Sequence, residues 1–139
     1  MEDREPLAWK AEYALGVPEV DRQHQELFRI INRLRQTPAG APAEHAAKRA
    51  IEGLVHYARY HFSTEEAFML DIGYPDADLQ AHNGQHQEFV RKVEDLGRIE
   101  HEGRPVAEAV AEFVYQWFTQ HIPVFDRGYV EAYRRRKGA

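Results

Sequence analysis

Hydrophobic side chains recur every three or four residues along four long stretches of this chain, the spacing of amphipathic helices. In the first stretch, for example, Leu27, Ile31 and Leu34 form one apolar stripe. The predicted helices cover residues 19–35, 43–72, 78–100 and 106–122. No useful length of sequence alternates polar and apolar residues as strands do. The pattern therefore predicts an all-α protein.

Turn residues separate the four stretches. The segment "QTPAGAP" follows the first, and Gly73 and Gly103 stand where the second and third helices end, each followed by a proline two residues later. Short connections between long helices favour antiparallel neighbours. We therefore predict an up-down-up-down four-helix bundle, with an irregular N-terminal arm over residues 1–18. The segment "RGYVEAYRRRK" is compatible with a short C-terminal helix, and residues 1–139 are expected to form one domain.

Composition narrows the class of protein. The chain is 43% hydrophobic and 29% charged, as soluble globular proteins are, and its net charge of −5 argues against a nucleic-acid partner. Without cysteine there is no disulfide, thiolate ligand or cysteine nucleophile. The polar start "MEDREPLAWK" is not a signal peptide and no apolar run could insert in a membrane, so we expect a cytoplasmic protein. The basic residues 134–137 are interpreted as a solvated tail.

Polar residues interrupt the apolar stripe of every predicted helix. Position 24 lies four residues after Val20 and three before Leu27, so its side chain points inward. The inward polar residues are His24 on the first helix, His61 and Glu65 on the second, His82 and His86 on the third, and His121 on the fourth. In contrast, His45 and His56 fall off the stripes and His101 lies past the third, so these three are expected to face solvent.

Burial of so many polar groups needs a compensating interaction. One unpaired buried polar group costs roughly 1–3 kcal/mol, whereas a whole domain is stable by only ~5–15 kcal/mol. Metal coordination satisfies imidazole nitrogens and carboxylate oxygens together. With only nitrogen and oxygen ligands, iron, manganese or zinc would suit the site.

A second carboxylate, Asp126, is a candidate ligand. It follows His121 by five residues, about 140° around a regular helix, so the two would not share a face. Pro123 lies between them, and a helix distorted at this proline would bring Asp126 back to the bundle axis. If the helix is regular here, Asp126 is a surface residue. Five histidines and two carboxylates are too many for one ion and suit two ions bridged by the carboxylates.

The motifs that carry these residues resemble the hemerythrin family, in its bacterial single-domain branch. They are "GVPEVDRQHQEL", "YHFSTEE", "YPDADLQAHNGQH" and "WFTQHIPVFD", together with Trp9 in the N-terminal arm. Their order and spacing fit the family over nearly the whole chain.

The resemblance implies a non-haem di-iron centre (Fe2+/Fe3+) with a bridging oxo or hydroxo group, which binds O2 reversibly. Carried over by position, His82, His86 and His121 would hold one iron, His24 and His61 the other, and Glu65 and Asp126 would bridge both. The second iron would keep a vacant position for O2.

Apolar residues one turn from these ligands are expected to form the O2 pocket and to exclude water. They are Leu27, Phe28, Phe62, Trp117 and Phe118. Phe118 stands where the family usually has leucine, and its larger ring could narrow the pocket. Glu66 lies about 100° around the helix from Glu65, and we expect it to be exposed or to support a ligand.

The leading hypothesis is an O2 carrier, store or sensor that is not an enzyme, with an unidentified O2-consuming or redox partner. One alternative is an oxidase or peroxidase, or an enzyme that detoxifies nitric oxide or peroxide, on the same scaffold. A second is a structural bundle that holds zinc.

Overall fold

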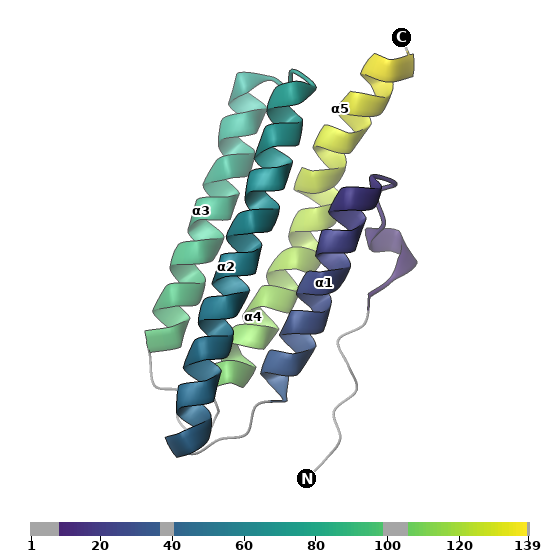
Figure 1. The fold of residues 1–139 in the computed structure, drawn as a ribbon. Helices are drawn as coiled ribbons and strands as arrows, with labels where there is room; N and C mark the ends of the chain where they lie inside the picture. Colours follow the sequence, from purple (N-terminus) through teal and green to yellow (C-terminus); the bar gives the residue numbers. More distant parts are fainter. Residues whose placement is uncertain (1–8, 37–40, 99–105, 139) are drawn as a thin grey trace.

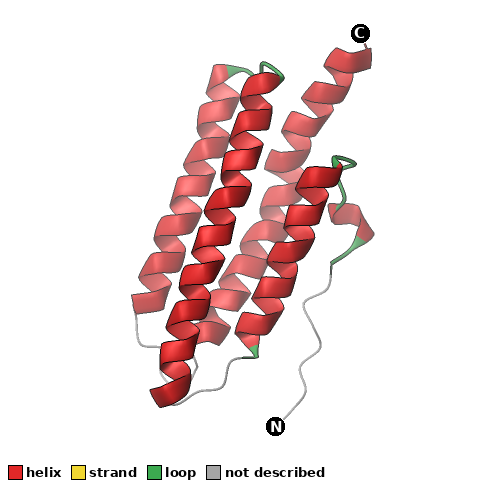
Figure 2. Cartoon of the chain, in the orientation of Figure 1, coloured by secondary structure: helices red, strands yellow, loops and turns green. Residues whose placement is uncertain are grey.

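The computed structural model describes residues 9–36, 41–98 and 106–138, and every regular element in them is helical (Figure 2). The elements are η1 (Ala11–Tyr13), α1 (Pro18–Arg35), α2 (Ala41–Asp71), α3 (Asp76–Arg98), α4 (Val106–His121), the π-helical turn η2 (Ile122–Asp126) and α5 (Arg127–Gly138). The four long helices begin and end within two residues of their predicted bounds. The predicted all-α class is thus confirmed.

The long helices form an antiparallel four-helix bundle (Figure 1). Around it, α1 packs between α2 and α4, and α3 closes the other side against the same two helices. The apolar stripes face the axis, as Leu27 and Ile31 of α1, Leu54 of α2 and Val110 of α4 show by their complete burial. Helix α5 follows η2 and continues in the direction of α4 (Figure 1).

A tight turn sets where α1 begins. Gly16 has φ of +81°, a conformation that glycine adopts without strain, and Pro18 is the first helical residue. The carboxylate of Asp21 accepts hydrogen bonds from the backbone nitrogens of Leu15 (2.8 Å) and Gly16 (3.0 Å). Asp21 therefore fixes the loop at Leu15 and Gly16 to the start of α1, three residues before His24.

The basic residues near the C-terminus correct one prediction. They belong to α5, where Arg134 donates through Nη2 to the carbonyl of Leu15 (2.5 Å) and Arg136 donates to the carbonyl of Ile72. These carbonyls lie in the two turns that precede α1 and follow α2. The interpretation of residues 134–137 as a solvated tail is wrong for these two arginines, since their side chains reach from α5 to the carbonyl groups of the two turns.

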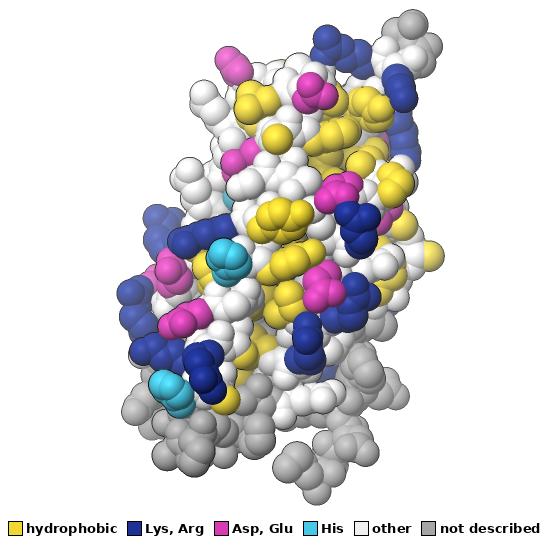
Figure 3. All heavy atoms as spheres, in the orientation of Figure 1, with side chains coloured by type: hydrophobic (Ala, Val, Ile, Leu, Met, Phe, Trp, Pro, Cys, Tyr) yellow, Lys and Arg dark blue, Asp and Glu magenta, His cyan; other side chains and the backbone are white. Residues whose placement is uncertain are grey.

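On the face drawn in Figure 3, side chains of both charge signs flank apolar side chains that gather along the middle. Within the described ranges, no helix has the length and apolar character needed to cross a bilayer. His45 and His56 are exposed as predicted, whereas His101 lies outside the described residues.

Candidate metal centre

Seven polar side chains from every helix of the bundle meet at its axis. They are His24 of α1, His61 and Glu65 of α2, His82 and His86 of α3, His121 of α4 and Asp126 of η2, none more than 3% exposed. These are the seven candidate ligands of the sequence, and the structure brings all of them together.

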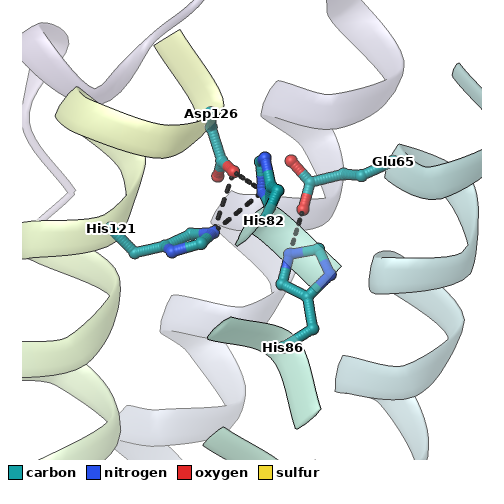
Figure 4. A group of neighbouring side chains, drawn as sticks. All are labelled: Glu65, His82, His86, His121 and Asp126. Carbon is teal, nitrogen blue, oxygen red and sulfur yellow. Dashed lines mark hydrogen bonds and ion pairs between the residues drawn. The ribbon is translucent and has the colours of Figure 1, made fainter. Parts of the chain in front are cut away.

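One part of the cluster joins α2, α3, α4 and η2 (Figure 4). Asp126 Oδ1 lies 2.9 Å from His82 Nε2 and 3.0 Å from His121 Nε2, and the two nitrogens are 3.1 Å apart. On the other side, His86 Nε2 lies 3.5 Å from Glu65 Oε1. Ligand atoms of these five residues all lie within 4.8 Å of one another.

The other part joins α1 and α2 to the same two carboxylates. His24 Nε2 lies 3.1 Å from Asp126 Oδ2, and His61 Nε2 lies 3.0 Å from Glu65 Oε1. The two imidazole ring centres are 4.5 Å apart. Ligand atoms of this group also lie within 4.8 Å of one another, so Glu65 and Asp126 belong to both groups.

The donor atoms fit metal ions better than they fit each other. Nε2 of His24, Oε1 of Glu65 and both oxygens of Asp126 are buried without a well-formed hydrogen bond among the described residues. Ligands about 2.1 Å from an octahedral ion lie about 3 Å apart. The 2.9–3.1 Å triangle of His82 Nε2, His121 Nε2 and Asp126 Oδ1 matches that spacing.

Both carboxylates are held ionised. Burial and the neighbouring Asp126 would raise the pKa of Glu65, but His61 and His86 outweigh them and lower this pKa to about 2. Burial likewise opposes ionisation of Asp126, yet His121, His24 and His82 hold its pKa well below the usual range. Two carboxylates ready to bind cations thus face the axis.

Four of the five imidazoles form two contrasting pairs. Burial lowers the pKa of His61 and of His121, so both are neutral and offer a lone pair. Burial also acts on His24 and His86, but facing carboxylates overcome it and raise both pKa values, that of His86 to about 9. Glu66 contributes at His86, where its Oε1 lies 3.6 Å from Nδ1, and it remains partly exposed. Glu66 therefore both faces solvent and supports a candidate ligand.

The π-helical turn explains how Asp126 reaches the axis. It spans Ile122–Asp126 and includes Pro123, the residue expected to distort the helix. Hydrogen bonds from i to i+5 bring residues five apart nearly into line, which a regular α-helix does not do. His121 and Asp126 therefore share a face.

Two residues at the centre are absent from the sequence-based set. Tyr129 is fully buried and donates a 2.7 Å hydrogen bond to Glu65 Oε2. Gln23 is also buried, and its Oε1 lies 2.8 Å from Nδ1 of His61. A sequence signal existed for each: Gln23 directly precedes His24, and Tyr129 follows Asp126 by three residues.

Aromatic rings surround the cluster. Phe62 stacks on His86 with ring centres 3.8 Å apart, and Trp117 stacks on His121 at 4.1 Å. Phe118 lies 6.1 Å from the His24 ring and 6.4 Å from the His61 ring.

The other apolar residues of the predicted pocket, Leu27 and Phe28, lie on α1. Leu27 is buried beside His24 on that helix, whereas Phe28 packs on Trp9, 5.3 Å away, rather than on a histidine ring. Trp9 itself lies 6.4 Å from the ring of His24. Trp9 therefore covers the α1 side of the cluster.

A family profile decides the identity of this arrangement. The profile described as "Hemerythrin HHE cation binding domain" matches residues 15–133. The chain belongs to the hemerythrin family. It is 31% identical over 130 residues to a bacteriohemerythrin of Clostridium acetobutylicum, covering 90% of this chain and 99% of the relative. A bacteriohemerythrin of Pseudomonas aeruginosa (strain LESB58) is 34% identical over 129 residues, covering 92% and 82%.

Solved hemerythrin structures share the fold. A wild-type hemerythrin crystal structure superimposes with a TM-score of 0.77 at 31% identity, covering 91% of this chain and 96% of the other. A point mutant of hemerythrin gives 0.76 at 31% identity, covering 91% and 95%. The four-helix bundle is thus the hemerythrin bundle, and the resemblance of the sequence motifs is confirmed.

Proposed function

We propose that this hemerythrin binds O2 reversibly at a non-haem di-iron centre. The observation that carries the proposal is the pair of ligand groups, one of five residues and one of four, that share Glu65 and Asp126. Two carboxylates common to two groups suit two ions that lie close together. The names of the relatives, bacteriohemerythrin, support the same function.

The two groups suggest how the ligands divide. His82, His86 and His121 would hold one iron, and His24 and His61 the other, with both carboxylates bridging. When bound, the iron pair supplies the two electrons that reversible O2 binding requires. With fewer histidines, the ion at His24 and His61 would keep a free coordination position for O2.

The surroundings of His24 and His61 suit O2 more than a polar substrate. Phe118 and Leu27 are fully buried on this side, and Phe62 lies 5.8 Å from the His61 ring. Apolar and aromatic walls exclude water and offer no proton to O2. This arrangement favours reversible binding over turnover, and Phe118 narrows the space that O2 would occupy.

Exposure of the reduced protein to O2 tests the proposal. We expect a stable coloured adduct that bleaches when O2 is removed under vacuum, over repeated cycles. Rapid turnover to oxidised iron would instead indicate an oxidase or peroxidase, and zinc as the only bound metal would indicate a structural bundle. We propose that the protein serves as a carrier, store or sensor of O2 and acts with a separate redox partner.

A further inference from the structure

We propose that Gln23 is a positioning residue that fixes which ring nitrogen of His61 faces the metal centre. The inference rests on the proposed metal function for its consequence, but the hydrogen bonds that carry it belong to the protein alone.

His61 differs from the other four histidines of the cluster. Its Nδ1, on the side of the ring away from Glu65, lies 2.8 Å from Gln23 Oε1, and both residues are buried. Among the described residues, the corresponding Nδ1 atoms of the other four rings form no hydrogen bond, although that of His86 faces Glu66 Oε1 at 3.6 Å; these rings are His24, His82, His86 and His121. His61 is therefore the ligand whose ring state the protein sets by a direct hydrogen bond.

The orientation of the Gln23 amide is itself determined. Its Nε2 donates to Glu19 Oε1 (2.9 Å) and to Thr64 Oγ1 (3.3 Å). A carboxylate only accepts, and the Thr64 hydroxyl is engaged as donor to the Tyr60 carbonyl (3.2 Å). Both neighbours therefore require the NH2 group of Gln23, which leaves its carbonyl oxygen to face His61.

The fixed carbonyl selects the tautomer of His61. A carbonyl oxygen accepts but cannot donate, so Nδ1 of His61 must carry the hydrogen. The lone pair then lies on Nε2, which points to the centre. Nε2 is 3.0 Å from Glu65 Oε1, and because both atoms are then acceptors, a metal ion between them would satisfy both. The opposite tautomer would place an N–H where a metal must bind and a lone pair against the Gln23 carbonyl. The partner of the outer nitrogen of a ligating histidine commonly sets its tautomer in this way.

The series of hydrogen bonds from Glu19 through Gln23 to His61 begins at the surface. Glu19 is about half-exposed, and it lines with Thr64 a groove of about 400 Å³ between α1 and α2. Substitutions at this end can therefore be accommodated without disturbing the bundle core. This permits a test in which the carboxylate of Glu19 and the amide of Gln23 are exchanged.

Histidine tautomers of the metal-free protein provide the first test. In chelator, 15N-histidine NMR of the wild type should show His61 protonated at Nδ1. Gln23→Leu should shift His61 toward the Nε2-protonated form, whereas Gln25→Leu, on the other side of His24, should leave it unchanged. An unchanged His61 tautomer in Gln23→Leu would overturn the proposal.

Ferrous iron titration provides the second test. We expect Gln23→Leu to weaken binding of one of the two ions by about 10–100-fold, the usual loss when such a partner is removed. The double variant Glu19→Gln with Gln23→Glu exchanges amide and carboxylate but keeps an acceptor at His61, so it should restore both the tautomer and the affinity. Equal affinity in Gln23→Leu and wild type, or no rescue by the exchange, would contradict the inference. If the wild type binds no iron, the proposed function fails, while the tautomer result still stands or falls by itself.

Discussion

Glu65 and Asp126 each face histidines from more than one helix. Glu65 lies near His61 of α2 and His86 of α3, and Asp126 lies near histidines of α1, α3 and α4. Because each carboxylate belongs to both ligand groups, its loss affects both proposed ions, whereas loss of a histidine removes a ligand from one.

Glu65→Ala should therefore abolish the oxygenated spectrum and reduce bound iron from about two ions per chain toward none. Elemental analysis and optical spectroscopy of the reduced protein with O2 check this. His45→Ala, at an exposed position, is the matched control and should leave both unchanged. A wild-type oxygenated spectrum in Glu65→Ala would show that the ligand assignment is wrong.

Tyr129 supports Glu65 through its 2.7 Å hydrogen bond. Because hydrogen bonds to charged groups contribute about 1.5–3 kcal/mol, Tyr129→Phe should lower the free energy of unfolding of the metal-free protein by that amount. Urea denaturation in chelator measures it. Tyr60→Phe, on an exposed ring, should change it by less than about 0.5 kcal/mol, and an equal effect of the two variants would argue against the role of Tyr129.

The seven candidate ligands could be found from sequence because a polar residue in an apolar stripe is a local signal. Gln23 and Tyr129 lie close in sequence to a candidate ligand, but this weaker signal does not reveal what they contact, since each acts on a residue of α2, 38 and 64 positions away in the chain. Their roles depend on how helices pack, which residue spacing alone does not encode.

At the scale of elements, η2 and α5 complete what the four long helices begin. The π-helical turn rotates Asp126 toward the axis, and the helix that follows carries Tyr129 into the core. Proline and residue spacing predicted a distortion at this point, but not its form. The residue pattern did not predict that arginines of α5 hold two turns, because a run of arginines looks the same in a solvated tail and in a packed helix.

Arg134→Ala tests this contact of α5. It removes the hydrogen bond from Nη2 to the Leu15 carbonyl, so the free energy of unfolding should fall by about 0.5–1.5 kcal/mol. Chemical denaturation is the measurement, and Arg135→Ala, a neighbouring exposed arginine, is the control with an expected change below about 0.5 kcal/mol. Equal losses in the two variants would mean that charge, not this contact, matters.

At the scale of the whole molecule, the centre links metal binding to the stability of the bundle. Four helices meet at buried charged groups, so any ion held there stabilises the folded state over the unfolded one. The bundle itself follows from the apolar stripes and turns of the sequence. Two statements remain predictions: that residues 1–139 form one domain, and that the protein is cytoplasmic.

The metal-free protein should show two pH limits of stability. The pKa of Glu65 falls from 4.5 to about 2 on folding, so its contribution is complete above pH 4.5 and is lost as pH falls toward 2. The pKa of His86 rises from 6.5 to about 9, so its contribution is complete below pH 6.5 and is lost as pH rises to 9. Urea denaturation across this range in chelator checks both limits.

His86→Gln tests the alkaline limit, because it removes one of the two histidines whose pKa is raised. It also removes a group that lowers the pKa of Glu65, so the acid limit should weaken as well. The free energy of unfolding of this variant should vary less between pH 6.5 and 9 than that of the wild type. If the wild type itself shows no change over that interval, the electrostatic description of His86 is incorrect.

The central claim is that a pair of iron ions holds the polar side chains at the axis of the bundle. Metal analysis of the aerobically purified protein, with its optical spectrum, tests this most directly. The account predicts about two irons per chain and a spectrum that changes reversibly when the reduced protein meets O2. Full stability in chelator with freely titrating imidazoles, or zinc as the only bound metal, would contradict it.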